Sequence, residues 1–147
     1  MKIKKILFPT DFSEVSHKTL EQAVYLAKTF NAELDIVYVV FGKMQLASTY
    51  VLQDTLNEFT KELESGVHKH MEEFTSECTF LKEVNFTTKI LTGSPHVEIV
   101  DYAEKTKVDL IVMSTHGYTG LKHMVLGSTA EKVIARVHCP VFIVKTS

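Results

Sequence analysis

The sequence contains little of several residues that mark particular protein classes. Its 147 residues include no tryptophan, two cysteines, three prolines and six glycines. The cysteines, Cys78 and Cys139, are too few for a disulfide framework and form no Cys-x-x-Cys pair, which excludes a disulfide-rich scaffold and a zinc knuckle. A hydrophobic fraction of 45%, with so little glycine and proline, also excludes a disordered or fibrous chain.

Long apolar runs and an excess of one charge are also missing. The longest apolar run, Ile36–Phe41, has six residues, whereas a membrane-spanning helix needs about 20. The 16 lysines and arginines are balanced by 18 aspartates and glutamates, so no basic surface for nucleic acid is expected. The basic start is followed by three apolar residues and then Pro9, which is too short for an export signal. We therefore expect one domain, residues 1–147, in the cytoplasm, with no membrane or nucleic-acid partner.

Short apolar runs alternate with amphipathic stretches along the whole chain. Apolar residues at three- and four-residue steps predict helices, and short runs rich in β-branched residues predict strands. The predicted strands are 6–8, 34–40, 84–91, 110–113 and 141–144, and the predicted helices are 13–30, 52–74, a third from 95, and 128–136. Because parallel strands need helical crossovers, this order predicts an α/β fold with one parallel sheet and helices on both faces.

Polar or glycine-bearing segments follow two of the predicted buried strands. Residues 9–13 follow the first strand, and residues 114–117 follow the fourth. In open parallel sheets, ligands bind beyond the carboxyl ends of the strands, at the point where the strand order reverses. These two segments are therefore the candidate ligand-binding positions.

The segment that begins at Gly127 is typical of a phosphate site. Ser128 and Glu131 match a capping box, which predicts a helix that starts at Ser128. A helix start attracts anions, Gly127 allows close approach to the backbone, and the Ser128 and Thr129 hydroxyls can donate hydrogen bonds. Simple turn and cap formation explains this segment equally well, and Asp11 alone is also typical of a helix start. The chain contains neither a Walker loop nor a Gly-x-Gly fingerprint.

Several separate blocks of the sequence match one known family. The matching blocks are Ile6–Ser13, Gly93–Pro95, Asp109–Met113, Ser114–Gly117, Gly127-Ser128 and Cys139–Val144. On these blocks the chain resembles the universal stress protein family from Lys4 to Lys145. ATP-binding members carry a glycine, two residues, a second glycine, nine residues, and then glycine with serine or threonine. This chain matches at Gly117, Gly127 and Ser128, and has Ser114 in place of the first glycine.

The resemblance implies a regulatory module of the stress response that binds ATP or AMP, with Mg²⁺ as a possible companion of ATP. It implies a Rossmann-like, adenine nucleotide alpha hydrolase-like fold with sheet order 3-2-1-4-5. Asp11 and the backbone around Val39 would hold the adenosine, Ser114–Gly117 would line the ribose and phosphate side, and Gly127–Thr129 would receive the phosphates. The implied binding residues are Pro9, Thr10, Asp11, Val39, Met113, Ser114, His116, Gly117, Gly127, Ser128 and Thr129.

The resemblance also leaves other functions open. Family members commonly form a homodimer through the last strand, which here comprises Val141, Phe142, Ile143 and Val144. A dimeric structural or interaction protein that binds no nucleotide is one alternative, and a slow ATP hydrolase is another. The sequence has no Walker lysine and no clear pair of carboxylates for Mg²⁺, so it indicates no catalytic residue, no resident metal and no dedicated catalysis.

Overall fold

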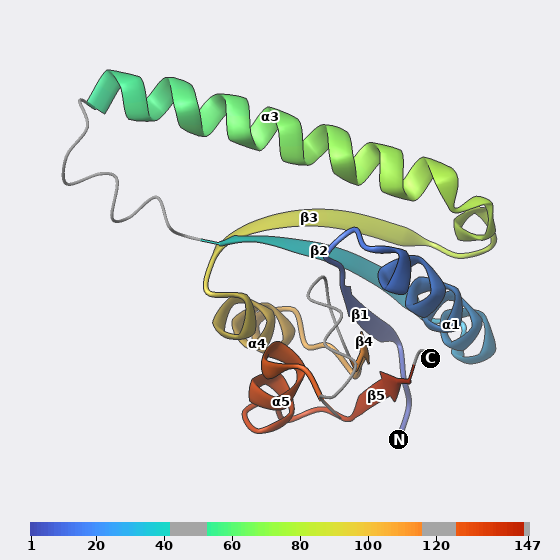
Figure 1. The fold of residues 1–147 in the computed structure, drawn as a ribbon. Coiled ribbons are helices and arrows are strands. Elements are labelled where there is room, and N and C mark those ends of the chain that lie inside the picture. The colour runs from blue at the N-terminus through green and yellow to red at the C-terminus, as the bar shows by residue number, and fades with distance from the viewer. Residues whose placement is uncertain (42–52, 116–125, 146–147) are drawn as a thin grey trace.

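Helices and strands alternate along the chain, at the predicted places (Figure 1). The computed structural model describes residues 1–41, 53–115 and 126–145. The elements are β1 (Lys5–Pro9), α1 (Glu14–Phe30), β2 (Glu33–Phe41), α3 (Gln53–Glu77), the 3-10 helix η1 (Thr79–Glu83), β3 (Phe86–Gly93), α4 (Pro95–Lys105), β4 (Leu110–Ser114), α5 (Ser128–Ile134) and β5 (Val141–Val144). Their bounds differ from the predicted ones by a few residues.

The strands form one parallel sheet in the order β3-β2-β1-β4-β5. β1 is the central strand and pairs with β2 on one side and β4 on the other. Both the parallel arrangement and the order 3-2-1-4-5 are therefore confirmed. The strand order reverses between β1 and β4, so their carboxyl ends mark the expected ligand position.

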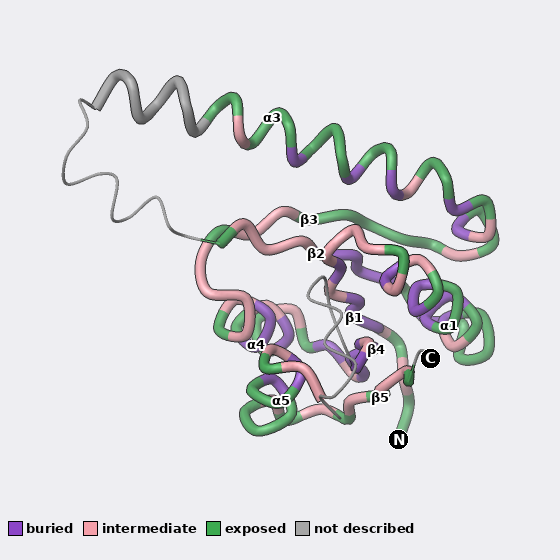
Figure 2. The backbone as a smooth tube through the Cα atoms, viewed as in Figure 1, coloured by how far each residue is buried: buried purple, intermediate pink, exposed green. Residues whose placement is uncertain are grey.

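Helices cover both faces of the sheet, as predicted. On one face, α1 and α3 pack over Ile6, Phe8 and Ile36, and α3 contributes Met71 and Phe74 to this core. On the other face, α4 and α5 pack over Leu7, Val37 and Ile111. Figure 2 shows buried positions recurring along the side of α3 that faces the sheet, while most of the described positions in that helix are exposed. Within the residues that the structure describes, none of the helices combines the length and apolar character that crossing a bilayer requires.

α1 is capped at both ends, and α5 starts at Ser128 as predicted but without the predicted side-chain cap. The Ser13 hydroxyl caps α1 by accepting a hydrogen bond from the Ser16 N–H at 3.2 Å, and Asn31 ends the helix in the left-handed conformation with φ 50°. The predicted capping box at Ser128 is wrong. Gly127 is the N-cap of α5, because its carbonyl already accepts the Glu131 N–H at 3.0 Å, and Ser128 is the first helical residue.

A buried carboxylate in β2 links the sheet to α4. Asp35 is 3% exposed. Its side chain accepts hydrogen bonds from the Thr87 hydroxyl at 2.8 Å and the Tyr102 hydroxyl at 3.0 Å, and Lys5 Nζ lies 3.6 Å away. Thus one side chain joins β1, β2, β3 and α4. The sequence pattern, which treats residues 34–40 as a uniformly apolar strand, did not predict this network.

Candidate functional site

A pocket of about 330 Å³ lies at the carboxyl ends of β1, β2 and β4. This volume is within the usual range of small-molecule sites, about 300–1,000 Å³. The starts of α4 and α5 complete its wall. The described lining residues are Pro9, Thr10, Asp11, Ser16, Val37, Tyr38, Val39, Pro95, Ile99, Met113, Ser114, Gly127, Ser128, Thr129 and Ala130. The pocket is therefore at the position where the strand order reverses.

The structure brings most of the residues proposed from the sequence into this one pocket. All of them except His116 and Gly117 belong to its lining, and those two lie outside the described residues. Sequence reasoning missed lining residues such as Tyr38, Pro95 and Ile99. Tyr38 could have been found as the neighbour of Val39 at the same strand end. The apolar periodicity of α4 does not reveal which of its residues face a pocket.

The turn between β1 and α1 fixes the Asp11 carboxylate in place. Oδ1 of Asp11 accepts hydrogen bonds from the Ser13 N–H at 3.0 Å and the Ser16 hydroxyl at 2.7 Å. The Thr10 hydroxyl oxygen accepts the Phe12 N–H at 3.0 Å, which tightens the same turn. As considered from the sequence, Asp11 therefore acts as a turn residue. In the part of the chain that the structure describes, Oδ2 makes no hydrogen bond, so this oxygen remains able to accept one from a ligand.

Phe12 has an unusual backbone conformation at this turn. Its φ is 64°, in the left-handed region that bulky side chains rarely occupy. The ring of Phe12 is not part of the pocket lining and stacks on Tyr38, with the ring centroids 4.4 Å apart. Strained residues of this kind persist when their surroundings hold them, and they cluster at binding sites.

The opposite wall of the pocket is built by the start of α5. The Gly127 N–H donates to the Thr115 carbonyl at 2.6 Å, which joins the residue after β4 to the residue before α5. This N–H is therefore not free for a ligand. Helix geometry leaves the N–H groups of Ser128 and Thr129 without an intrahelical partner, and both residues line the pocket. The backbone N–H groups that can donate to a ligand on this wall therefore begin at Ser128 and not at Gly127.

The pocket carries little charge of its own. Asp11 is the one ionisable side chain other than Tyr38 among the described lining residues. Valine, isoleucine and methionine side chains from β2, α4 and β4 supply an apolar surface beside it. Across the described ranges, no three His, Cys, Asp or Glu side chains are grouped to hold a metal ion. The arrangement suits a flat, largely apolar group at one end and a hydrogen-bond acceptor, such as a phosphate, at the other.

Comparisons with known proteins place the chain in a family. The sequence model of the universal stress protein family matches residues 2–145. Universal stress protein MJ0531 of Methanocaldococcus jannaschii is 42% identical over 147 residues, with 97% of this chain and 82% of that protein covered. Universal stress protein MJ0577 of the same organism is 37% identical, with 97% and 94% covered.

Solved structures show the same fold. The structure of the hypothetical protein MJ0577 matches with a TM-score of 0.78 at 34% identity, covering 100% of this chain and 99% of that one. A universal stress protein in complex with cAMP matches over the full length of both chains with a TM-score of 0.72 at 21% identity. A universal stress protein from Archaeoglobus fulgidus in complex with dAMP has a TM-score of 0.59 at 19% identity, covering 97% and 98%. From the match over nearly the whole sequence and the identity to curated relatives, the chain belongs to the universal stress protein family.

Proposed function

We propose that this chain binds an adenine nucleotide, ATP or AMP, in the pocket at the carboxyl ends of β1, β2 and β4, as a regulatory module of the stress response. The observation that carries the proposal is the convergence of four separate segments on one pocket. These segments are the ends of β1, β2 and β4 and the start of α5. Two proteins of the same fold are described in complex with cAMP and dAMP, which supports a nucleotide as the ligand class. Cytoplasmic location stays a prediction.

The described residues fit the parts of a nucleotide. The apolar side chains of Val39, Ile99 and Met113 suit the faces of a purine base. Oδ2 of Asp11 can accept a hydrogen bond from an amino or ribose hydroxyl group. The first N–H groups of α5 and the Ser128 and Thr129 hydroxyls provide donors for phosphate oxygens.

Mg²⁺ would enter such a site on the phosphates rather than on a resident set of ligands. Asp11 is the single carboxylate among the described lining residues, whereas Mg²⁺ in nucleotide sites is held by carboxylates together with phosphates. The pocket residues bind and orient the ligand in this proposal, and no side chain is assigned a catalytic step. The alternative of slow ATP hydrolysis is tested separately, by measuring phosphate release over hours.

Calorimetric titration with ATP, ADP and AMP tests the proposal. Gly127→Val should abolish binding, because the added side chain occupies the space beside the α5 donors. The fold should tolerate this change, since Gly127 has φ −69° and ψ 152°, an extended conformation that valine adopts readily. Gly66→Val is the matched control, because a side chain at Gly66 in α3 meets nothing within 4 Å. Absence of heat and of a thermal shift with all three nucleotides at millimolar concentration would refute the proposal.

We also propose that β5 forms a homodimer with its copy in a second chain. β5 is an edge strand of four residues, and Phe142 is 45% exposed, which leaves an apolar edge to be paired or covered. Phe142→Lys should convert the dimer to a monomer in analytical ultracentrifugation. A wild-type chain that sediments as a monomer at every concentration would contradict this. A dimer that binds no nucleotide would favour the alternative of a structural or interaction protein.

A further inference from the structure

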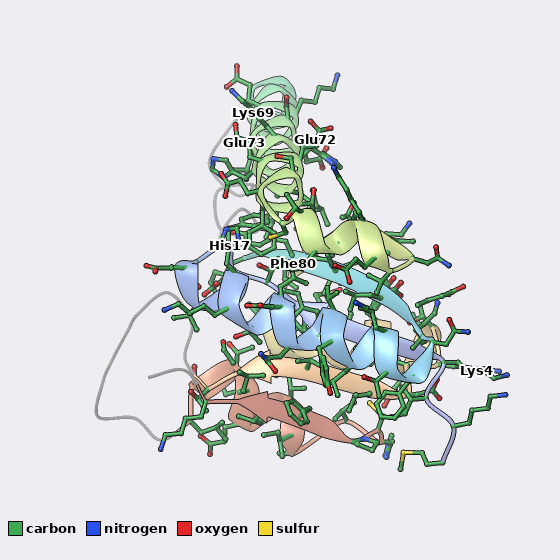
Figure 3. All side chains as sticks on the ribbon, turned by 90° about the vertical axis from the view of Figure 1, so that its right-hand side faces the viewer. Lys4, His17, Lys69, Glu72, Glu73 and Phe80 are labelled. Carbon is green, nitrogen blue, oxygen red and sulfur yellow. The ribbon has the colours of Figure 1, made fainter. Side chains whose placement is uncertain are left out.

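A second pocket lies between the β1–α1 turn and the C-terminal half of α3. Its volume is about 630 Å³, and it shares Asp11 and Tyr38 with the first pocket. Figure 3 shows His17, from the start of α1, below α3 on the side where Glu73 lies, whereas Glu72 lies on the opposite side of that helix. Most of this second pocket takes no part in the proposed nucleotide site.

Aromatic rings form one wall of the second pocket. The rings of Phe12 and Tyr38 are stacked, with an angle of 15° between their planes. The ring of Phe74, from α3, packs against Phe12 with 5.5 Å between centroids, and His70 meets Phe12 edge-on at 6.1 Å. The face of an aromatic ring carries partial negative charge, so the ring faces that this stack leaves uncovered attract cations.

Carboxylates surround this aromatic wall. Asp11, Glu73 and Glu77 line the pocket, and its described lining includes no lysine or arginine. The imidazole of His17 is held by two neighbours, since Nδ1 lies 3.2 Å from Cys78 Sγ and Nε2 lies 3.5 Å from Glu77 Oε2. Burial, with a smaller contribution from Glu77, raises the pKa of the Cys78 thiol to about 11, so this thiol keeps its proton and adds no charge. Three carboxylates therefore face a pocket whose other polar side chains are two imidazoles and a phenol.

We propose that the second pocket binds a small organic cation, namely an ammonium ion that carries carbon substituents. The ring faces attract the positive charge, the carboxylates neutralise it, and the carbon substituents cover the apolar wall. A bare metal ion fits less well, because no group of three metal-ligating side chains is found within the described residues. An anion would be repelled by the carboxylates. The proposal does not depend on nucleotide binding in the first pocket.

Choline and 3,3-dimethyl-1-butanol are the probes, because they have the same shape and differ in charge. Each is titrated into the full ¹⁵N-labelled chain at constant ionic strength and without nucleotide, and amide shifts are followed by NMR. Choline should shift the signals of Phe12, His70 and Phe74 with a dissociation constant in the millimolar range. The uncharged alcohol should bind about fivefold more weakly, since a cation–π contact at an accessible site and nearby carboxylates favour the charged probe by about that factor.

Paired variants distinguish binding in the second pocket from general attraction of choline to the negatively charged surface. Glu73→Gln removes a carboxylate from the pocket and should weaken choline binding about threefold, as expected for an exposed charge pair. Glu72→Gln makes the same change on the other side of α3 and should leave it unchanged. Phe12→Leu keeps an apolar side chain but removes one ring, so the preference for choline over the alcohol should become smaller, and the carboxylates should retain part of it. Thermal melts establish that each variant is folded.

Three results would overturn the proposal. One is equal binding of choline and the alcohol by the wild-type chain, and the second is an equal effect of the two glutamate substitutions. The third is the absence of shifts around the pocket at the highest choline concentration. Each result can occur whether or not ATP binds, so the two proposals fail independently.

Discussion

Tyr102→Phe tests whether the buried Asp35 network stabilises the fold. The change removes the hydroxyl that donates to Asp35 at 3.0 Å and keeps the ring that packs beside the core under α4. Asp35 keeps Thr87 and Lys5 as partners, so the loss should lie at the low end of values for hydrogen bonds to charged groups, about 1.5–2 kcal/mol. For a chain of this size that lowers Tm by about 3–8 °C.

The difference between wild type and variant should depend on pH in a defined direction. Burial, followed by the charge and the hydrogen bond of Asp35, raises the pKa of Tyr102 to about 12. In the unfolded chain the tyrosine pKa is about 10, so the unfolded state loses this proton first as the pH rises. The stabilisation is therefore complete below pH 10 and is lost between pH 10 and 12. Two pKa units correspond to at most about 2.7 kcal/mol, and the partial exposure of Tyr102 reduces this value.

Urea unfolding at pH 7, 9 and 11 measures both effects. The free-energy gap between wild type and Tyr102→Phe should be largest at pH 7 and 9 and smaller at pH 11. Tyr25→Phe is the matched control, because Tyr25 is 66% exposed and its hydroxyl should contribute less than about 0.5 kcal/mol. A gap at pH 7 no larger than that of the control would refute the stabilising role of the network. A gap that widens at pH 11 would refute the sign of the pKa argument.

Two further substitutions test the backbone conformation at Gly93 and the effect of Ser114 on ligand binding in the pocket. Gly93→Ala should destabilise the fold by about 1–3 kcal/mol in urea, because Gly93 has φ 148° and an added Cβ would lie 2.5 Å from Glu98 Oε1; Gly66→Ala, in open space on a helix, should not destabilise it. Ser114→Gly should change ATP affinity by no more than about fivefold in calorimetry, the value of one hydrogen bond. Strong ATP binding by the variant alone would show that Ser114 closes the pocket.

The order of helices and strands could be predicted from apolar periodicity, because each element buries one continuous face or run. The order of strands in the sheet could not, since it depends on which faces meet in space, and it came from the family resemblance. The hydrogen-bond network of Asp35 could not be predicted from the sequence either. Tyr102 and Thr87 lie 67 and 52 residues from Asp35 along the chain, so no local pattern connects them.

Part of the candidate site could be predicted because of the geometry that all parallel sheets share. Residues that follow the strands of a parallel sheet meet at one edge, which is why Asp11 and Ser114 lie in the same pocket. The start of α5 at Ser128 was predicted correctly, but the capping box was wrong, because Gly127 is the N-cap and no side chain caps this helix. Ile99 was missed because its contact depends on where α4 crosses the sheet. The binding roles of all these residues stay predictions until ligands are titrated.

The central place of β1 has a consequence for synthesis on the ribosome. β1 is the first strand to be made, but its second neighbour, β4, begins only at Leu110, with residues 10–109 in between. At roughly 5–20 residues per second, β1 waits on the order of 5–20 s for that partner. Until then the edge of β1 at Ile6 and Leu7 has no β4 to pair with, and it stays uncovered even after β2 and β3 have been made. Aggregation and chaperone engagement of this chain should therefore peak for nascent chains that end just before β4.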